Sequence, residues 1–97
     1  MRFSFASNDL AELYQFGVGT KLHPHLVKVF RRIVDVIATA PDERALRGIK
    51  SLHMEKLRGN REGQYSVRLN DQYRLAFTIE SDGHGNYLLI IDLVDYH

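Results

Sequence analysis

The chain has 97 residues, of which 44% are hydrophobic and 26% charged, a composition typical of one small folded domain. It has no cysteine, which excludes disulfides, thiolate metal ligands and a cysteine nucleophile, and makes a reducing cytoplasm the simplest compartment. The longest apolar run, residues 87–91, is far shorter than the roughly 20 residues of a membrane span, and the N-terminus lacks a basic-then-apolar signal pattern. We therefore expect a single domain over residues 1–97 that is neither embedded in a membrane nor exported.

The first half of the chain is predicted to form one short strand followed by helices. Residues 1–5 alternate between apolar and polar side chains, which favours a strand. A serine cap then predicts a helix over residues 7–16, closed by a glycine. A second helix runs from Pro24 until residues 40–42 and carries apolar residues at helical spacing. A short helical turn is expected over residues 43–47.

The second half changes its hydrophobic period from 3.6 to 2. Residues 64–70 and 73–80 both carry apolar side chains at odd positions, which predicts two half-buried antiparallel strands joined by a turn at residues 70–72. If both apolar sets face one core, a three-residue loop satisfies the parity of the pairing and places Arg68 opposite Arg74. A five-residue loop also satisfies parity and separates the two arginines by one pair.

Two arginines facing each other on the side of the sheet away from the core repel mildly. Such a pair favours binding of an anion between the two guanidinium groups, although each side chain can also swing into solvent.

Residues 81–86 are predicted to form the next turn. The nearly continuous apolar run at residues 87–94 is typical of a central strand covered on both faces, and it leads into the polar residues 95–97.

Charge is unevenly distributed along the chain although the net charge is only +1. Residues 1–43 carry five basic and five acidic side chains, residues 44–74 carry eight basic and three acidic ones, and residues 75–97 carry four acidic and none basic. This segregation is compatible with a positive patch that binds a polyanion, and equally with a solvated face whose counter-charges the fold supplies.

The last three residues, Asp95, Tyr96 and His97, have side chains suited to chemistry on RNA. An imidazole transfers protons near neutral pH, a carboxylate orients it, and an aromatic ring stacks on a base. Arginines supply the positive charge that a phosphorane-like transition state needs. A terminal histidine is nevertheless more often without a function, so spacing alone leaves both readings open.

The other motifs indicate little chemistry. His23 and His25 flank a helix start and lack an evident third metal ligand, so exposed cap residues explain them best. His84 lies in a predicted turn, where solvent exposure is the simpler account. No glycine-rich phosphate loop is present. We expect neither a metal nor another cofactor.

Residues 57–74 and the ending Val94-Asp95-Tyr96-His97 resemble the HigB toxins, or plasmid maintenance system killer proteins, of the RelE/ParE superfamily. The resemblance implies an α/β (α+β) fold in which two N-terminal helices pack on a mostly antiparallel twisted sheet with the active site on its concave face. It further implies ribosome-dependent cleavage of mRNA by metal-free attack of the ribose 2′-hydroxyl. The positions that match the family's catalytic residues are Arg58, Arg74, Asp95, Tyr96 and His97.

By this resemblance His97 transfers protons with Asp95 orienting it, Arg58 and Arg74 stabilise the pentavalent phosphate, and Tyr96 positions the RNA. Some relatives have a histidine where this chain has Glu55; His53 lies two positions away and reaches the same face if the segment is extended. Basic side chains around the site are expected to bind RNA and the ribosome; with His53 they are Lys56, Arg61, Arg68, Arg47 and Lys50.

The implied partners are a cognate helix-turn-helix (HigA-like) antitoxin, the ribosome with its mRNA, and operator DNA through the antitoxin. Two other functions on the same fold stay open. One is a ParE-like protein that poisons DNA gyrase by binding, which would not require the proton-transfer group at residue 97. The other is an inactive toxin that acts only as a co-repressor with its antitoxin.

Overall fold

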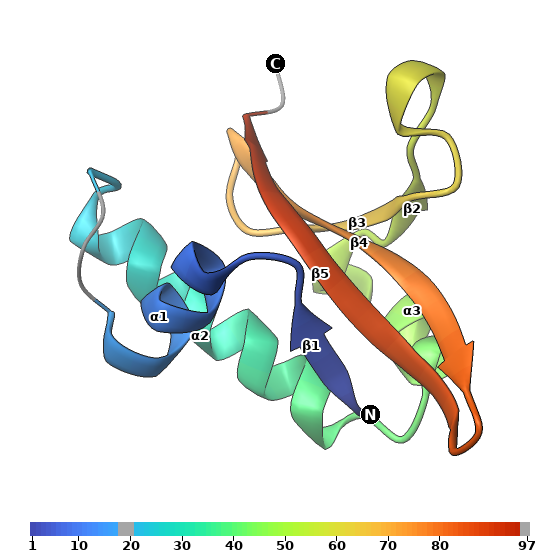
Figure 1. Ribbon diagram of the computed structural model, residues 1–97. Helices are drawn as coiled ribbons and strands as arrows, with labels where there is room; N and C mark the ends of the chain where they lie inside the picture. The colour runs from blue at the N-terminus through green and yellow to red at the C-terminus, as the bar shows by residue number, and fades with distance from the viewer. Residues whose placement is uncertain (18–20, 96–97) are drawn as a thin grey trace.

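The computed structural model describes residues 1–17 and 21–95, which form helices packed on a twisted five-stranded sheet (Figure 1). The strand order is β1-β5-β4-β3-β2; β1 runs parallel to β5 and the other pairs are antiparallel. The elements are β1 (Phe3–Phe5), α1 (Asn8–Phe16), α2 (Pro24–Thr39), α3 (Glu43–Gly48), η1 (Lys50–Leu52), β2 (Glu55–Lys56), η2 (Gly59–Arg61), β3 (Tyr65–Arg68), β4 (Tyr73–Asp82) and β5 (Gly85–Asp95). The predicted α+β class with a mostly antiparallel sheet is confirmed.

The helices begin and end where their caps predict. The Ser7 Oγ accepts a hydrogen bond from the Leu10 amide at 3.2 Å, and Gly17 ends α1 in the left-handed region at φ 69°. The Nδ1 of His23 accepts from the His25 amide at 3.0 Å at the start of α2, which confirms that these histidines serve as exposed cap residues. No helix within residues 1–17 or 21–95 is both long and apolar enough to cross a membrane.

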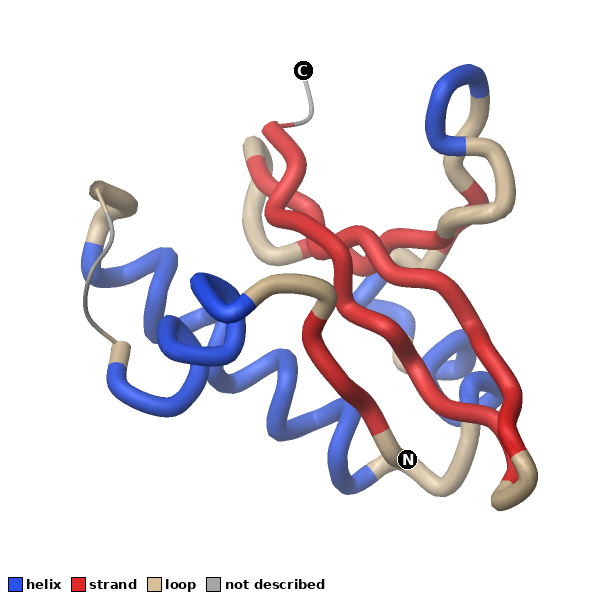
Figure 2. The backbone as a smooth tube through the Cα atoms, viewed as in Figure 1, coloured by secondary structure: helices blue, strands red, loops and turns tan. Residues whose placement is uncertain are grey.

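The core lies between the helices and one face of the sheet. Phe30, Val34 and Ile37 of α2 are fully buried against Phe77 of β4 and Ile90 of β5, within one continuous apolar cluster. Figure 2 shows the helices gathered along the sheet while the loop that contains η2 projects away from them. The opposite face of the sheet therefore stays available for a site between this loop and the strands.

The hairpin between β3 and β4 has the register that parity predicts. Arg68 pairs with Arg74, and the Leu69 amide donates to the Tyr73 carbonyl at 3.0 Å, so the loop comprises residues 70–72. The Asn70 side-chain oxygen accepts from two backbone amides within this turn, at 2.9 and 2.7 Å. Because the Asn70 side chain is hydrogen-bonded to the turn amides, β3 ends at Arg68, two residues earlier than the alternation suggests.

The turn predicted over residues 81–86 is present, but its predicted bounds are wrong because it is shorter. Strand pairing continues to Asp82 and Gly85, which leaves a two-residue turn. The Asp82 carboxylate stabilises this tight turn by accepting from the His84 amide at 2.8 Å, and it also accepts from the guanidinium of Arg2, the residue before β1. His84 is exposed in the turn, as predicted.

The prediction that the last strand is covered on both faces is also wrong. β5 lies between β1 and β4 as expected, and Leu88 and Ile90 are fully buried on the core face. Leu89 and Ile91 point to the opposite face and are only half-buried. A β-bulge interrupts the pairing with β4, because Phe77 pairs with Ile90 whereas its neighbour pairs with residue 92.

Candidate functional site

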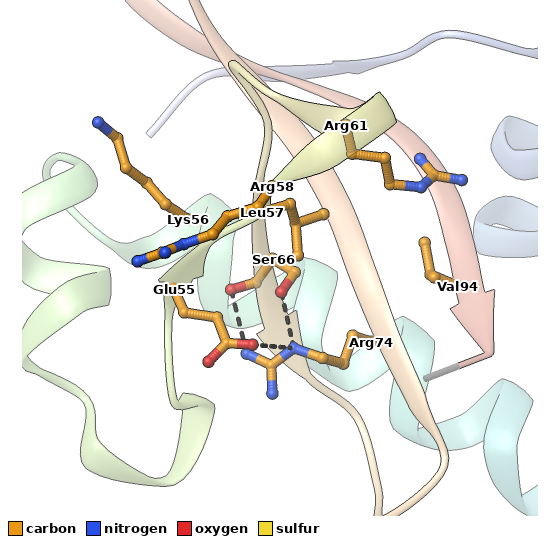
Figure 3. A pocket seen from close by; sticks show the side chains of 8 residues that line it. All are labelled: Glu55, Lys56, Leu57, Arg58, Arg61, Ser66, Arg74 and Val94. Atoms are coloured by element: carbon orange, nitrogen blue, oxygen red, sulfur yellow. Dashed lines mark hydrogen bonds and ion pairs between the residues drawn. The ribbon is translucent and has the colours of Figure 1, made fainter. Parts of the chain in front are cut away.

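A pocket of about 520 Å³ lies on the face of the sheet opposite the helices, beneath the loop of residues 57–64 (Figure 3). Its walls come from β2 and the loop that follows it, from β3 and β4, and from the end of β5. The lining residues are Glu55, Lys56, Leu57, Arg58, Arg61, Ser66, Arg74 and Val94. Four of these eight side chains are cationic and one is anionic, so the pocket favours an anionic ligand.

Arg74 supplies a fixed charge to this pocket. The residue is 8% exposed, and its Nε donates to the buried Ser66 Oγ at 2.6 Å. Its Nη2 donates to the carbonyl oxygen of His53 and to that of Ser66. The Glu55 carboxylate lies 3.7 Å from Nε, as Figure 3 shows. Because hydrogen bonds to Ser66 and His53 and the ion pair with Glu55 hold the guanidinium, it presents positive charge without rearrangement.

Arg68 does not act as the second half of an anion clamp with Arg74. The two residues pair across the hairpin as predicted, but Arg68 forms an ion pair with Asp71 of the turn. Arg74 is instead bonded to Ser66 and lies beside Glu55. The fold therefore supplies a carboxylate beside each arginine, and the register does not require an anion between them.

An ion pair connects the loop to the sheet. The Arg61 Nη2 donates to the Asp92 carboxylate of β5 at 2.9 Å, and its Nη1 donates to the Gln64 side chain at 3.0 Å. The side chains of Arg61 and Asp92 are 34% and 50% exposed. Asp92 was missed in the sequence analysis, although an acidic residue within an apolar strand was a usable signal. Arg61 thus serves first to position the loop.

Lys56 and Arg58 are exposed and extend away from β5, in contrast to Arg61 (Figure 3). Within the described parts of the chain neither forms an ion pair. Their charges remain available to a ligand. The guanidinium groups of Arg58 and Arg74 do not converge in this structure, so a phosphate held by both requires the exposed Arg58 side chain to turn inward.

The remaining predicted binding residues do not line the pocket. His53 does not belong to an extended segment, which corrects the reasoning offered for it: it follows η1 with φ 44°, its side chain is exposed, and its carbonyl oxygen accepts from Arg74. Arg47 of α3 lies over the Tyr65 ring at 6.0 Å from the centroid, and Lys50 is exposed in η1.

Asp95 lies on the other face of the sheet from the pocket. It pairs with Tyr73, whereas Val94 pairs with Arg74, and paired residues share a face. The side chain of Asp95 is exposed and accepts from Gln72 Nε2 at 3.1 Å. The other two residues of the predicted catalytic set, Tyr96 and His97, fall outside the described residues.

The described residues contain no group of three or more histidine, aspartate or glutamate side chains placed to hold a metal ion. The pocket combines one fixed cation, exposed cations that can move, and the Glu55 carboxylate beside the fixed cation. That combination can bind a phosphodiester and exchange a proton next to it.

Comparison with known proteins identifies the family to which this chain belongs. Residues 3–97 match the model of the family described as RelE-like toxin of type II toxin-antitoxin system HigB. The chain belongs to this HigB-like family of type II toxins, which confirms the resemblance seen in the sequence.

Individual relatives agree with the family. An uncharacterized protein of Haemophilus influenzae is 33% identical over 89 residues, which make up 91% of this chain and 88% of that protein. The YoeB/ParE toxin from Agrobacterium tumefaciens has a similar fold, with a TM-score of 0.61 at 19% identity and full coverage of both chains. The YoeB-YefM complex from Staphylococcus aureus gives a TM-score of 0.54 at 26% identity, over 100% of this chain and 97% of that one.

Proposed function

We propose that this toxin is an endoribonuclease that cleaves mRNA on the ribosome. The ribose 2′-oxygen attacks the adjacent phosphorus, the bond from phosphorus to the 5′-oxygen breaks, and the products carry a 2′,3′-cyclic phosphate and a 5′-hydroxyl group. The observation that carries the proposal is the buried Arg74, held by Ser66 and His53 at the base of a cationic pocket. A fixed guanidinium of this kind stabilises the charge that develops on the phosphate oxygens.

The proton transfers are assigned to two groups. His97 acts as general acid or base, as the family resemblance implies. Glu55 is the second proton-transfer group. Its carboxylate lines the pocket and lies 3.7 Å from the Arg74 Nε. A carboxylate and an imidazole together serve the two proton transfers of the reaction, removal from the 2′-hydroxyl and delivery to the leaving 5′-oxygen.

The remaining predicted residues are assigned supporting roles. Arg58 turns toward the scissile phosphate when RNA binds, Tyr96 positions the RNA, and Asp95 acts through His97. The exposed cations around the pocket, among them Lys56 and Lys50, bind the phosphates of mRNA and ribosomal RNA. The ribosome holds the mRNA in a geometry suitable for attack, which supplies an orientation contribution that a small open pocket lacks.

We further propose that an antitoxin binds the toxin and blocks this activity in the cytoplasm. A solved relative of this fold is described as a YoeB-YefM complex. An antitoxin of the helix-turn-helix type would also connect the toxin to operator DNA. Purification of the toxin together with the product of an adjacent small reading frame tests the pairing, and failure of the two to co-purify would contradict it.

A reconstituted translation reaction with a defined mRNA tests the enzymatic proposal. New 5′ ends are mapped by primer extension, with and without ribosomes, for the wild type, Arg74→Lys, Glu55→Gln and His97→Ala. We expect cuts that require ribosomes and fall by about 10²–10³ in Arg74→Lys and by about 10²–10⁴ when a proton-transfer group is removed. Arg32→Lys, an exposed arginine of α2, is the matched control.

The same reaction, read together with whether expression of the wild-type protein arrests cell growth, distinguishes the other functions of this fold. Absence of cuts from a wild-type protein that arrests growth contradicts the proposal and points to binding of a target such as gyrase. Absence of both cuts and growth arrest points to a co-repressor without toxicity.

A further inference from the structure

A second pocket, which we call the edge pocket, lies on the reverse side of the loop that covers the candidate site. It has a volume of about 570 Å³ and is lined by Lys56, Leu57, Arg58, Gly59, Glu62, Gly63 and Tyr65. We propose that the edge pocket binds the nucleobase that flanks the scissile phosphate and selects adenine or cytosine over uracil through the exocyclic amino group. This inference rests on the proposed function, which places RNA in the neighbouring pocket.

The register of the sheet places the two pockets on opposite faces of its edge. Glu55 pairs with Ser66, and both line the candidate site but not the edge pocket; Lys56 pairs with Tyr65, and Tyr65 lines the edge pocket alone, whereas Lys56 at the sheet edge lines both. β2 is the outermost strand of the sheet, so an RNA strand can pass around it from one face to the other. Lys56, Leu57 and Arg58 line both pockets, and the exposed Arg58 guanidinium can bind the phosphate at the crossing point.

The wall formed by Tyr65 is rigid. Its ring stacks on the buried Phe77 with centroids 6.1 Å apart and an interplanar angle of 21°, while the Arg47 guanidinium lies over it at 6.0 Å from the centroid. Since Phe77 and Arg47 both pack on this ring, Tyr65 has little freedom to move when a ligand enters. A pocket with one fixed aromatic wall keeps its shape and can discriminate between planar ligands.

The remaining walls suit a flat ring. Gly59 and Gly63 have positive φ angles of 66° and 89°, and a Cβ built on either meets no atom within 4 Å. The largely buried Leu57 adds an apolar surface. Because the glycines carry no side chains, the space next to the loop backbone stays open to a base.

The charges of the edge pocket fit a nucleotide better than a peptide. Lys56 and Arg58 attract phosphates, whereas the exposed Glu62 carboxylate forms no ion pair with any residue the structure describes. A carboxylate accepts a hydrogen bond from the amino group of cytosine, and adenine offers an equivalent donor. An acidic peptide would be repelled by Glu62 and a basic peptide by the two cations.

Base preference at the cut tests this role of Glu62. Ribosomes programmed with mRNAs that carry each of the four bases at the positions flanking the cut are treated with the wild type, Glu62→Ala and Glu80→Ala. Glu80 is an exposed glutamate of β4 outside both pockets and serves as the control. We expect Glu62→Ala to keep cutting but to lower the preference for adenine or cytosine over uracil at one flanking position by about fivefold or more.

The ratio between bases is the informative quantity, because loss of a negative charge strengthens RNA binding to all sequences alike. Glu80→Ala is expected to keep the wild-type ratio. An unchanged ratio in Glu62→Ala, with efficient cutting, would overturn the inference.

A titration without ribosomes separates this inference from the proposed function. NMR spectra of the isotope-labelled protein are recorded with CMP, AMP or UMP. We expect CMP and AMP to shift the Gly63 and Tyr65 amide signals more than UMP does, and Glu62→Ala to abolish the difference. If the wild type shows this difference but cuts no mRNA, the proposed function fails while the edge pocket stands. If CMP and UMP act alike on the wild type, the inference is refuted whatever the cleavage result.

Discussion

Replacing Ser66 by alanine removes the oxygen that holds the Arg74 guanidinium in place. Ser66 is 1% exposed and Arg74 is 8% exposed, and the Arg74 Nε donates to the Ser66 Oγ at 2.6 Å. At this depth water is poorly placed to replace the lost hydroxyl. The variant leaves a buried, charged donor without that partner, while the arginine keeps its bonds to the carbonyl oxygens of His53 and Ser66.

The expected loss of stability follows from this geometry. A hydrogen bond to a charged group contributes about 1.5–3 kcal/mol, and an unsatisfied buried donor costs a similar amount. We therefore expect Ser66→Ala to lower the free energy of unfolding by about 2 kcal/mol. With a urea dependence of roughly 1–3 kcal/mol per molar for a chain of this size, the unfolding midpoint falls by roughly 1 M.

Urea unfolding followed by circular dichroism measures this difference. Ser81→Ala, at an exposed position of β4, is the matched control and is expected to stay within about 0.5 kcal/mol of the wild type. If Ser66→Ala were as stable as Ser81→Ala, Arg74 would not depend on Ser66, and the account of a fixed charge in the pocket would be refuted.

Three further predictions concern the loop of residues 57–64, the end of α1 and the contact between Arg2 and Asp82. Asp92→Asn weakens the half-exposed ion pair with Arg61, so we expect the free energy of unfolding to fall by less than about 1 kcal/mol. Amide hydrogen exchange in residues 59–64 is expected to accelerate. Unchanged exchange would show that the ion pair does not hold the loop. Gly17→Ala is expected to lower the free energy of unfolding by about 1–2 kcal/mol in thermal unfolding, because Gly17 has a φ of 69° and an added Cβ would lie 3.0 Å from the Arg31 Nη1. A variant as stable as the wild type would exclude this strain. Arg2 lowers the pKa of Asp82, so their contact stabilises the fold above the ordinary carboxyl pKa of about 3.9 and is lost as pH falls through the lowered value. In Arg2→Gln the pKa of Asp82, followed by NMR, rises toward the ordinary value; a pKa that does not move would assign the shift to the turn amide instead.

The elements that the sequence predicts are those with local signals. Ser7 caps α1, a proline opens α2, and the parity of the apolar residues sets the β3–β4 register, including the Arg68–Arg74 pair. Each of these features depends on residues within a few positions of one another. By contrast, the two-residue strand β2 carries no periodicity of its own and exists only because β3 pairs with it.

The bulge in β5 explains why the candidate site is only partly predictable. Without it, Asp92 would continue the core-facing series of Leu88 and Ile90. With one extra residue inserted, Asp92 reaches the pocket face and contacts Arg61, and Asp95 turns to the face of Tyr73. Alternation along the chain contains no sign of this shift. Sequence reasoning therefore selects Arg58 and Arg74 for the pocket but assigns Arg61 to RNA binding without its partner.

Substitution of one ribose by a 2′-deoxynucleotide in the mRNA tests the central claim most directly. Ribosomes carrying a defined mRNA are treated with the toxin, and the mRNA has either a ribose or a deoxyribose immediately 5′ of the mapped cut. Attack by the 2′-hydroxyl predicts that the ribose mRNA is cut to a 2′,3′-cyclic phosphate and a 5′-hydroxyl, whereas the deoxy mRNA stays intact at that position. Cleavage of both mRNAs at equal rates would contradict the proposed reaction.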